Sequence, residues 1–298
     1  MKYNHITVAG SGVLGSQIAF QTAFKGFNVS VYDINDDALE AAKDRIMELK
    51  SRYQEDLKAS VEEVDSAYNR ISFSSDLAKA VSEADLVIEA IPEVVQIKIE
   101  FYKQLAKVAP EKTIFATNSS TLLPSQFAEA TGRPEKFLAL HFANEIWTNN
   151  TAEIMKHPGT DMKVFDDVIE FAKAIGMVAL PLHKEQPGYI LNSLLVPFLE
   201  AAQMLFLKEV ADPETIDKTW MIATGSPKGP FAILDVVGIK TAYNISLTKA
   251  EADVPGFDKL AEKLKKEYID KGKLGRETGE GFYQYPNPSF LEPDFLKK

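Results

Sequence analysis

The chain contains no cysteine and only four histidines among its 298 residues. The absence of cysteine excludes disulfide bonds, a thiolate nucleophile and cysteine-ligated metal. The histidines lie at positions 5, 141, 157 and 183, and their spacing is not that of metal ligands. We therefore predict no metal site, which disfavours a metal-dependent hydrolase.

Basic residues are in the minority, with 33 lysines and arginines against 43 acidic residues and a net charge of −10. Because nucleic-acid binding needs a basic face, we expect no nucleic-acid partner, although this charge is compatible with a local basic pocket for one phosphorylated ligand. The start of the chain lacks a long apolar segment. The longest apolar stretch, residues 189–206, is interrupted by Asn192, Pro197 and Glu200, which predicts a buried helix rather than a membrane span. These features are typical of a soluble, cytoplasmic protein.

What the sequence does have is an alternation of β-rich runs and helical patterns over its first 185 residues. Such alternation predicts an α/β fold with a doubly wound, mostly parallel sheet. Two further segments, 151–157 and 177–183, could extend that sheet. The other predicted strands are residues 5–9, 28–33, 71–73, 85–91, 113–118 and 137–142, and one long polar helical region covers residues 36–68.

The pattern changes after residues 184–188, a short polar stretch that contains proline and glycine. Beyond it only helical patterns occur, at 188–208, 213–223, 230–250 and 257–271. We therefore predict two domains: residues 1–185 as the α/β domain and residues 186–298 as a smaller all-helical domain.

A glycine-rich loop, Gly10-Ser-Gly12-Val13-Leu14-Gly15, follows the first predicted strand and opens the first helix. In this context the spacing G-x-G-x-x-G predicts a dinucleotide site of the Rossmann type. The first glycine permits a tight turn, the second lets the backbone approach a pyrophosphate, and the third lets the helix pack closely on the strand. The N–H groups that begin the helix would face the phosphates.

Asp33 ends the second predicted strand, where an acidic residue is expected to accept hydrogen bonds from the adenosine ribose. Residues 34–37 include no arginine or lysine that would neutralise a 2′-phosphate. NAD is therefore favoured over NADP. FAD fits the same loop, but a helical second domain favours a nicotinamide cofactor.

Three polar clusters follow predicted strands: Glu93, the segment Asn118-Ser119-Ser120, and His141. Each has an ordinary explanation, as a solvated loop residue, a turn with a helix cap, or a hydrogen-bonded core histidine. Strand ends on the carboxyl side of such a sheet carry the ligand site, however, and the cofactor loop lies at the same edge. Together the three clusters therefore favour a functional site.

Histidine suits proton transfer during alcohol oxidation because its unperturbed pKa lies near neutrality. A carboxylate on the other ring nitrogen would hold the required tautomer of His141 and stabilise its charged form. Glu145 and Glu153 both follow closely in the sequence, and spacing alone does not decide between them.

These stretches resemble the L-3-hydroxyacyl-CoA dehydrogenase family, and the resemblance covers nearly the whole chain. It implies reversible, NAD-dependent oxidation of a 3-hydroxyacyl-CoA, an activity of fatty acid metabolism, by a dinucleotide-binding domain joined to a helical domain that dimerises. The matching stretches are GSGVLGSQIA, DLVIEAIPEVVQIK, FATNSSTL, FLALHFAN, PGYILNSLLVPFLEAA, GSPKGPFAILDVVG and LGRETGEGFYQY.

The resemblance also assigns roles to individual residues. His141 matches the catalytic histidine, and Glu153 rather than Glu145 matches its paired glutamate. Ser120 and Asn192 match residues that hydrogen-bond the reacting oxygens.

Other matching positions lie near the cofactor. Glu93 and Lys98 match positions near its nicotinamide half, and Asn118 is expected to bind the cofactor as well.

Two departures from the family stand beside the histidine. Ala143 and Glu145 replace a phenylalanine and a proline, and Glu145 adds a negative charge. The family uses lysine and serine in the region 36–68 to hold the CoA nucleotide, and no basic residue here can be assigned to that role from sequence. The candidates are Lys43, Arg45, Lys50, Arg52 and Lys58.

Two rival functions remain open. A dehydrogenase of the same architecture could act on a free hydroxy acid of the carnitine or sugar-acid type. A non-catalytic NAD-binding protein is disfavoured, because binding NAD does not require Ser120, His141, Glu153 and Asn192 together.

Overall fold

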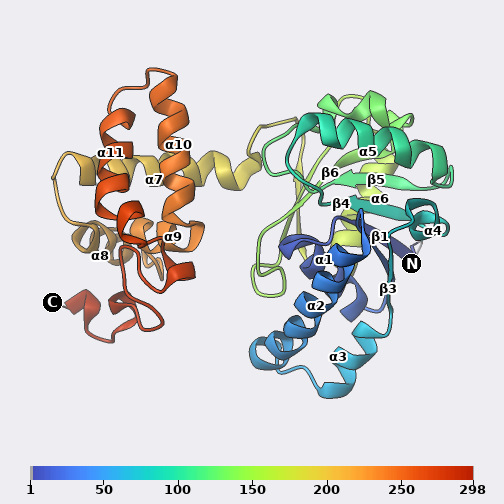
Figure 1. Cartoon of the computed structure of the whole chain (residues 1–298), viewed down its shortest axis with the longest axis horizontal. Helices are drawn as coiled ribbons and strands as arrows, with labels where there is room; N and C mark the ends of the chain where they lie inside the picture. The colour runs from blue at the N-terminus through green and yellow to red at the C-terminus, as the bar shows by residue number, and fades with distance from the viewer. Residues whose placement is uncertain (1–2, 298) are drawn as a thin grey trace. The chain divides into compact units, whose positions relative to one another are not determined.

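The computed structural model describes residues 3–297. The chain divides into two compact units, Met1–Leu191 and Asn192–Lys298, and each is described by itself (Figure 1). The first unit is α/β and the second is helical, as predicted.

Among the described residues, the first unit contains one eight-stranded sheet with strand order β3-β2-β1-β4-β5-β6-β7-β8. Neighbouring strands are parallel except β6 and β7, which form an antiparallel pair. The mostly parallel, doubly wound sheet is therefore confirmed. The strands are β1 His5–Ala9, β2 Asn28–Tyr32, β3 Ile71–Ser74, β4 Leu86–Glu89, β5 Ile114–Thr117, β6 Phe137–Phe142, β7 Thr151–Met155 and β8 Val178–Leu182.

The helices of the first unit are α1 Val13–Phe24, α2 Asp36–Leu57, α3 Val61–Tyr68, α4 Leu77–Val81, α5 Val95–Val108 and α6 Met162–Ala174. The region 36–68 is helical, as predicted, but the sequence pattern did not show that the chain breaks between α2 and α3. Lys58 ends α2 in the left-handed conformation, with φ 58°. Ser60 then begins α3 through a capping box with Glu63.

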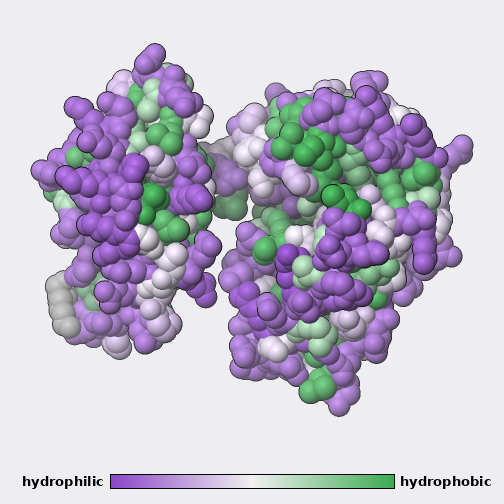
Figure 2. All heavy atoms as spheres, in the orientation of Figure 1, coloured by the Kyte–Doolittle hydropathy of each residue, from purple (hydrophilic) through white to green (hydrophobic). Residues whose placement is uncertain are grey.

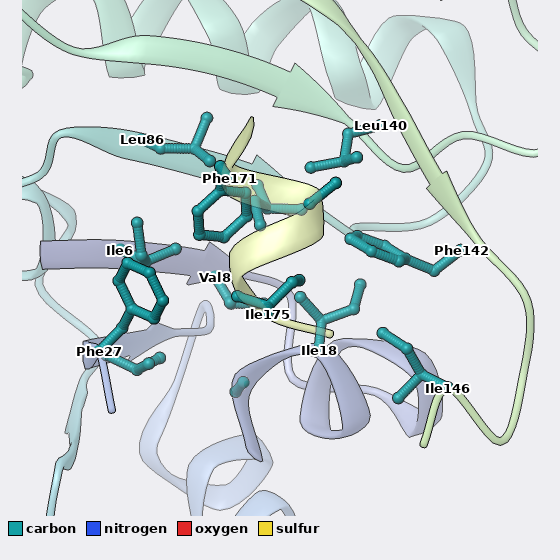
Figure 3. Close-up of a cluster of buried hydrophobic side chains, with 14 of the residues drawn as sticks. Ile6, Val8, Ile18, Phe27, Leu86, Leu140, Phe142, Ile146, Phe171 and Ile175 are labelled. Atoms are coloured by element: carbon teal, nitrogen blue, oxygen red, sulfur yellow. The ribbon is translucent and has the colours of Figure 1, made fainter. Parts of the chain in front are cut away.

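Both faces of the sheet are covered, so its central strands are buried along their whole length. On one face, side chains of β1, β4 and β6 pack against α1 and α6, as Figure 3 shows for Val8, Leu86, Leu140, Ile18 and Phe171. Successive side chains of a strand alternate between faces. His141, which follows Leu140 in β6, therefore points to the opposite face, at the carboxyl end of the strand.

The helices of the second unit are α7 Tyr189–Leu207, whose first residues belong to the first unit, α8 Pro213–Thr224, α9 Pro230–Val237, α10 Ile239–Glu251 and α11 Phe257–Glu267. The predicted helix over 230–250 is two helices, because Gly238 adopts φ 94° between α9 and α10. The core of this unit gathers aromatic and leucine side chains from its helices and from the tail, among them Phe206, Phe231, Leu234, Leu260 and Phe282.

Helix α7 is less buried than its sequence predicted. Among the described residues, it is the one helix long and apolar enough to cross a membrane by length and composition, but only 22% of that window is buried. Leu194 and Leu205 of α7, and Ile222 of α8, are exposed. Apolar atoms are accordingly visible among the polar ones on the surface of the helical unit (Figure 2).

Two buried carboxylates hold the C-terminal tail onto the helical unit. Asp235 accepts hydrogen bonds from the backbone N–H groups of Phe282 (2.8 Å) and Tyr283 (2.9 Å) and from the Tyr285 hydroxyl (3.2 Å). The Tyr283 hydroxyl donates to the second carboxylate, Asp217, at 2.9 Å. The tail is therefore anchored by groups whose charge depends on pH.

We expect the stability of the helical unit to depend on pH through Asp235. Burial raises the pKa of Asp235 to about 6, and Asp217 nearby adds to the shift. A carboxyl whose pKa is raised on folding binds its proton preferentially in the folded state. Its contribution to the free energy of unfolding is thus greatest below about pH 4 and declines, by on the order of 2–3 kcal/mol, as pH rises through 6.

The asparagine of Asp235→Asn does not titrate. The difference in the free energy of unfolding between the native chain and this variant should therefore shrink between about pH 4 and pH 7. The chain has two tryptophans, Trp147 and Trp220. In a Trp147→Phe background, fluorescence of Trp220 reports unfolding of the helical unit in urea. A deficit that stays constant over this pH range would contradict the prediction.

Candidate functional site

The glycine loop has the geometry that close backbone approach requires. Gly10 adopts φ 96°, and a Cβ there would lie 2.5 Å from the carbonyl oxygen of Ala90. A Cβ at Gly15 would lie 1.9 Å from the carbonyl oxygen of Gly10. At Gly12, the N-cap of α1, a Cβ would meet no described atom within 4 Å, and no side chain caps the helix. The open helix start therefore fits a phosphate group.

A cavity of about 750 Å³ extends from this loop across the ends of β2 and β4. Its lining includes Gly10, Gly12, Tyr32, Asp33, Ile34, Ile91, Phe101 and Gln104. The size and mixed lining suit a nucleoside. Ser11 fixes the Asp33 carboxylate at this edge, through its N–H (2.8 Å) and its hydroxyl (2.6 Å). Arg45 of α2 donates to the carbonyl of Ser11 at 3.0 Å.

A second cavity, of about 250 Å³, begins at Gly12, Val13, Leu14 and Gly15. Its other lining residues include all three remaining residues predicted to bind the cofactor, together with the predicted substrate ligand: Glu93, Lys98, Asn118 and Ser120. The structure therefore brings the predicted cofactor residues and Ser120 to one edge of the sheet. The cavity at Asp33 fits the adenosine half of a dinucleotide, the glycine loop fits its phosphates, and the cavity at Glu93, Lys98 and Asn118 fits its nicotinamide half.

Glu93 is an exposed loop residue, but its carboxylate is hydrogen-bonded to a neighbouring loop. Its Oε1 accepts hydrogen bonds from the Ser119 hydroxyl (2.5 Å), from the N–H of Ser120 (3.0 Å), and from the N–H and hydroxyl of Thr121 (both 3.0 Å). Burial alone would raise the pKa of Glu93, but these donors and the Lys98 ammonium outweigh it and lower the pKa. A charged Glu93 thus organises the loop that carries Ser120.

Lys98 is buried in an ionic cluster beneath this loop. Its Nζ lies 2.5 Å from Glu89 and 3.3 Å from Glu93. Glu89 is buried at the end of β4 and also accepts the hydroxyls of Tyr102 (2.9 Å) and Thr117 (2.8 Å). Lys98 therefore links the core of the sheet to the cofactor cavity.

His141 lies between a carboxylate and a hydroxyl. In the antiparallel pair β6–β7 it stands directly opposite Glu153. The Nδ1 atom of His141 is 3.1 Å from Oε2 of Glu153, and its Nε2 atom is 3.2 Å from Oγ of Ser120. The partner carboxylate is therefore Glu153, and the other ring nitrogen faces the hydroxyl that also lines the cofactor cavity.

The second oxygen of Glu153 accepts the N–H groups of Ile190 (2.8 Å) and Leu191 (3.0 Å), at the start of α7. Burial would raise the pKa of Glu153, but the hydrogen bonds from His141, Leu191 and Ile190 prevail and lower it. The carboxylate is thus held charged and oriented, as stabilisation of an imidazolium requires.

Glu145, the other candidate carboxylate, is paired with a basic residue of α2. Its carboxylate pairs with Arg52 of α2 at 2.8 Å, and the Arg52 guanidinium lies 4.6 Å from the Trp147 ring centroid. The N–H of Glu145 donates to Gln17 of α1 at 2.8 Å. Its φ of 59° is one that proline cannot adopt. Proline could therefore not replace Glu145 without a change in the backbone of this loop, in which Ile146 packs in the core (Figure 3).

The basic residues of the region 36–68 have partners within the chain. Lys43 pairs with Glu40 and Lys50 with Asp65, while Arg45, Arg52 and Lys58 are bonded to Ser11, Glu145 and Glu55, respectively. Exposed pairs such as Lys43–Glu40 are weak and easily displaced. The Arg52–Glu145 pair is exposed as well, and the guanidinium also lies over the Trp147 ring.

Two residues near the start of α7, Tyr189 and Asn192, stand differently with respect to the sequence predictions. Asn192, predicted as a substrate ligand, lies in the first turn of α7 and belongs to the second unit, so its role stays a prediction. Tyr189, which the sequence did not single out, stacks on the His141 ring. Its only signal in the sequence was its place directly after Pro187-Gly188.

Two family models together match most of the chain. A family model described as the NAD binding domain of 3-hydroxyacyl-CoA dehydrogenase matches residues 5–186, and one described as the C-terminal domain of the same family matches residues 188–285. Human mitochondrial hydroxyacyl-coenzyme A dehydrogenase is 37% identical, with 94% of this chain and 91% of that protein covered. A probable 3-hydroxybutyryl-CoA dehydrogenase of Bacillus subtilis is 35% identical, with 96% and 98% covered.

Solved structures agree in fold and differ in the substrates that their names give. A diketoreductase described as catalysing reactions of dicarbonyl compounds aligns with a TM-score of 0.91 and 57% identity, over 96% of this chain and 100% of its own. The (S)-3-hydroxybutyryl-CoA dehydrogenase of Ralstonia eutropha aligns with a TM-score of 0.82 and 27% identity, over the same shares.

Proposed function

Since the chain belongs to the 3-hydroxyacyl-CoA dehydrogenase family, whose members are NAD-dependent oxidoreductases, we propose that it reduces one ketone of a free 1,3-dicarbonyl compound to the alcohol, reversibly. The observation that carries the reaction is the row Glu153–His141–Ser120 beside the cofactor cavity.

In the direction of reduction, the charged imidazole of His141 donates the proton on Nε2 to the ketone oxygen, which becomes the hydroxyl. Glu153 stabilises the charged ring through Nδ1, and the Ser120 hydroxyl donates to the same oxygen as negative charge develops on it. The nicotinamide, when bound, supplies the hydride for the carbonyl carbon. In oxidation, neutral His141 accepts the hydroxyl proton.

Two observations favour a substrate without CoA. The diketoreductase is 57% identical to this chain, compared with 37% for human hydroxyacyl-coenzyme A dehydrogenase, 35% for the Bacillus subtilis protein and 27% for the Ralstonia eutropha enzyme. Arg52, beside the loop that follows His141, is already paired with Glu145 and stacked on Trp147. A phosphate of CoA at Arg52 would compete with the Glu145 carboxylate for the guanidinium. An acyl-CoA thioester is the second candidate, which the family models favour.

The test compares NADH oxidation with pentane-2,4-dione and with acetoacetyl-CoA. We expect kcat/KM for the free diketone to exceed that for the thioester, because the phosphates of CoA would compete with Glu145 for Arg52 whereas the diketone carries no phosphate. Preference for the thioester would establish the second candidate. Tight NADH binding without turnover of either compound would point to the free hydroxy acids, which are assayed next in the direction of oxidation.

We also infer a homodimer. Exposed apolar residues of the helical unit, including Leu194, Leu205 and Ile222, would be buried in such an interface. Light scattering measures the mass of the purified chain. A cytoplasmic location stays a prediction.

A further inference from the structure

Tyr189 contacts His141 and also the loop that carries Ser120. Its ring stacks on the imidazole of His141, with 4.5 Å between centroids and 21° between planes. Its hydroxyl donates to the carbonyl oxygen of Ser119 at 2.7 Å, in the loop that carries Ser120. Tyr189 is fully buried. One side chain thus spans the distance between the histidine and the serine loop.

The backbone of Tyr189 is held just as firmly. Its φ of 55° is uncommon for a residue with a bulky side chain. Such conformations persist where the surroundings enforce them, often at functional sites. Here the next two N–H groups, of Ile190 and Leu191, donate to Glu153. The unusual turn therefore does two things at once: it stacks the Tyr189 ring on His141, and it directs the first N–H groups of α7 at Glu153.

The chemistry of the phenol supports a fixed role as donor. Burial raises the pKa of Tyr189, and Glu93 and Glu153 add to the shift. The hydroxyl therefore keeps its proton at ordinary pH and remains a donor to the Ser119 carbonyl. The ring face also attracts a charged imidazole, by the cation–π interaction.

We propose that Tyr189 is a positioning residue with two separable functions: its ring orients the His141 imidazole, and its hydroxyl fixes the loop that presents Ser120. This rests on the proposed role of His141 and Ser120. Tyr189 itself neither donates nor accepts the transferred proton.

Two variants separate these functions, assayed with NADH and pentane-2,4-dione. Tyr189→Phe keeps the ring and loses the hydroxyl, so kcat/KM for the diketone should fall about tenfold. Tyr189→Leu loses both, and kcat should fall about 100-fold, the scale on which misplacement by about 1 Å reduces rates. The dissociation constant of NADH should stay within twofold in each. Tyr53→Phe is the matched control, because it removes a buried hydroxyl that bonds Gln21 elsewhere in the same unit.

A second measurement needs no turnover. In the NMR spectrum, the ring protons of His141, assigned by their loss in His141→Gln, should carry an upfield ring-current shift from Tyr189. The shift should survive in Tyr189→Phe and disappear in Tyr189→Leu. The proposal is overturned if Tyr189→Leu leaves this shift unchanged, or if Tyr189→Phe matches Tyr53→Phe in kcat/KM. An inactive native chain whose ring shift behaves as expected would reject the proposed reaction and leave the positioning of His141 intact.

Discussion

His141→Ala should lose about 10³- to 10⁴-fold in kcat with any carbonyl substrate that the native chain reduces. Proton transfer to the ketone oxygen needs an acid at the position of the His141 Nε2 atom, and the Ser120 hydroxyl alone is a poor acid. Glu153, left without its partner, would add a negative charge beside the developing alkoxide. NADH should still bind, since the glycine loop and its cavity do not include His141.

The matched control is His183→Ala, which removes an exposed histidine of the same unit. It should retain native turnover and NADH affinity. Fluorescence titration measures NADH binding, and stopped-flow absorbance measures the loss of NADH with saturating substrate. Turnover of His141→Ala within tenfold of the native chain would reject the assignment of His141 as the proton donor.

Much of this site could be predicted because it follows from local rules. The glycine loop combines a strand end, a helix start and fixed spacing. The roles of Gly10, Gly12 and Gly15 could therefore be predicted without knowledge of the tertiary structure. The carboxyl ends of parallel strands meet at one edge of the sheet, and this rule alone predicted that Ser120 and His141 lie close together.

The choice between Glu145 and Glu153 could not be made from the residues alone. It depends on the register of β6 and β7, in which a slip of one residue would turn every side chain to the other face. That register is set by a loop whose contacts reach α1 and α2, through Gln17 and Arg52. Only the resemblance to a family supplied the answer in advance.

Two other features of the structure were not predicted from the sequence, for different reasons. The break before α3 was readable, because Ser60 and Glu63 have the spacing of a capping box, but the continuous polar pattern concealed it. The contact of Tyr189 with His141 was not readable, because it joins segments that are distant in the sequence through a left-handed turn. Sequence patterns report periodicity and spacing, and neither encodes such a contact.

Lys98→Met should lower the free energy of unfolding of the first unit by about 3–5 kcal/mol. Lys98 and Glu89 are both almost fully buried, so the substitution leaves the Glu89 carboxyl group buried without its cation. The hydroxyls of Tyr102 and Thr117 and the N–H of Ile91 still donate to Glu89 but do not replace the ammonium group. Adding Glu89→Gln should recover at least half of the loss, because the neutral amide can accept the same two hydroxyls.

Urea unfolding in a Trp220→Phe background measures this, since Trp147 then reports the first unit alone. Lys112→Met is the matched control: it breaks an ion pair with Asp85 whose lysine is 56% exposed, and it should cost less than about 1 kcal/mol. If Lys98→Met cost no more than Lys112→Met, the buried pair would be energetically dispensable. If the double variant were no more stable than Lys98→Met, the loss would come from packing rather than from an uncompensated charge. The recovery in the double variant therefore separates electrostatics from packing beneath the cofactor cavity.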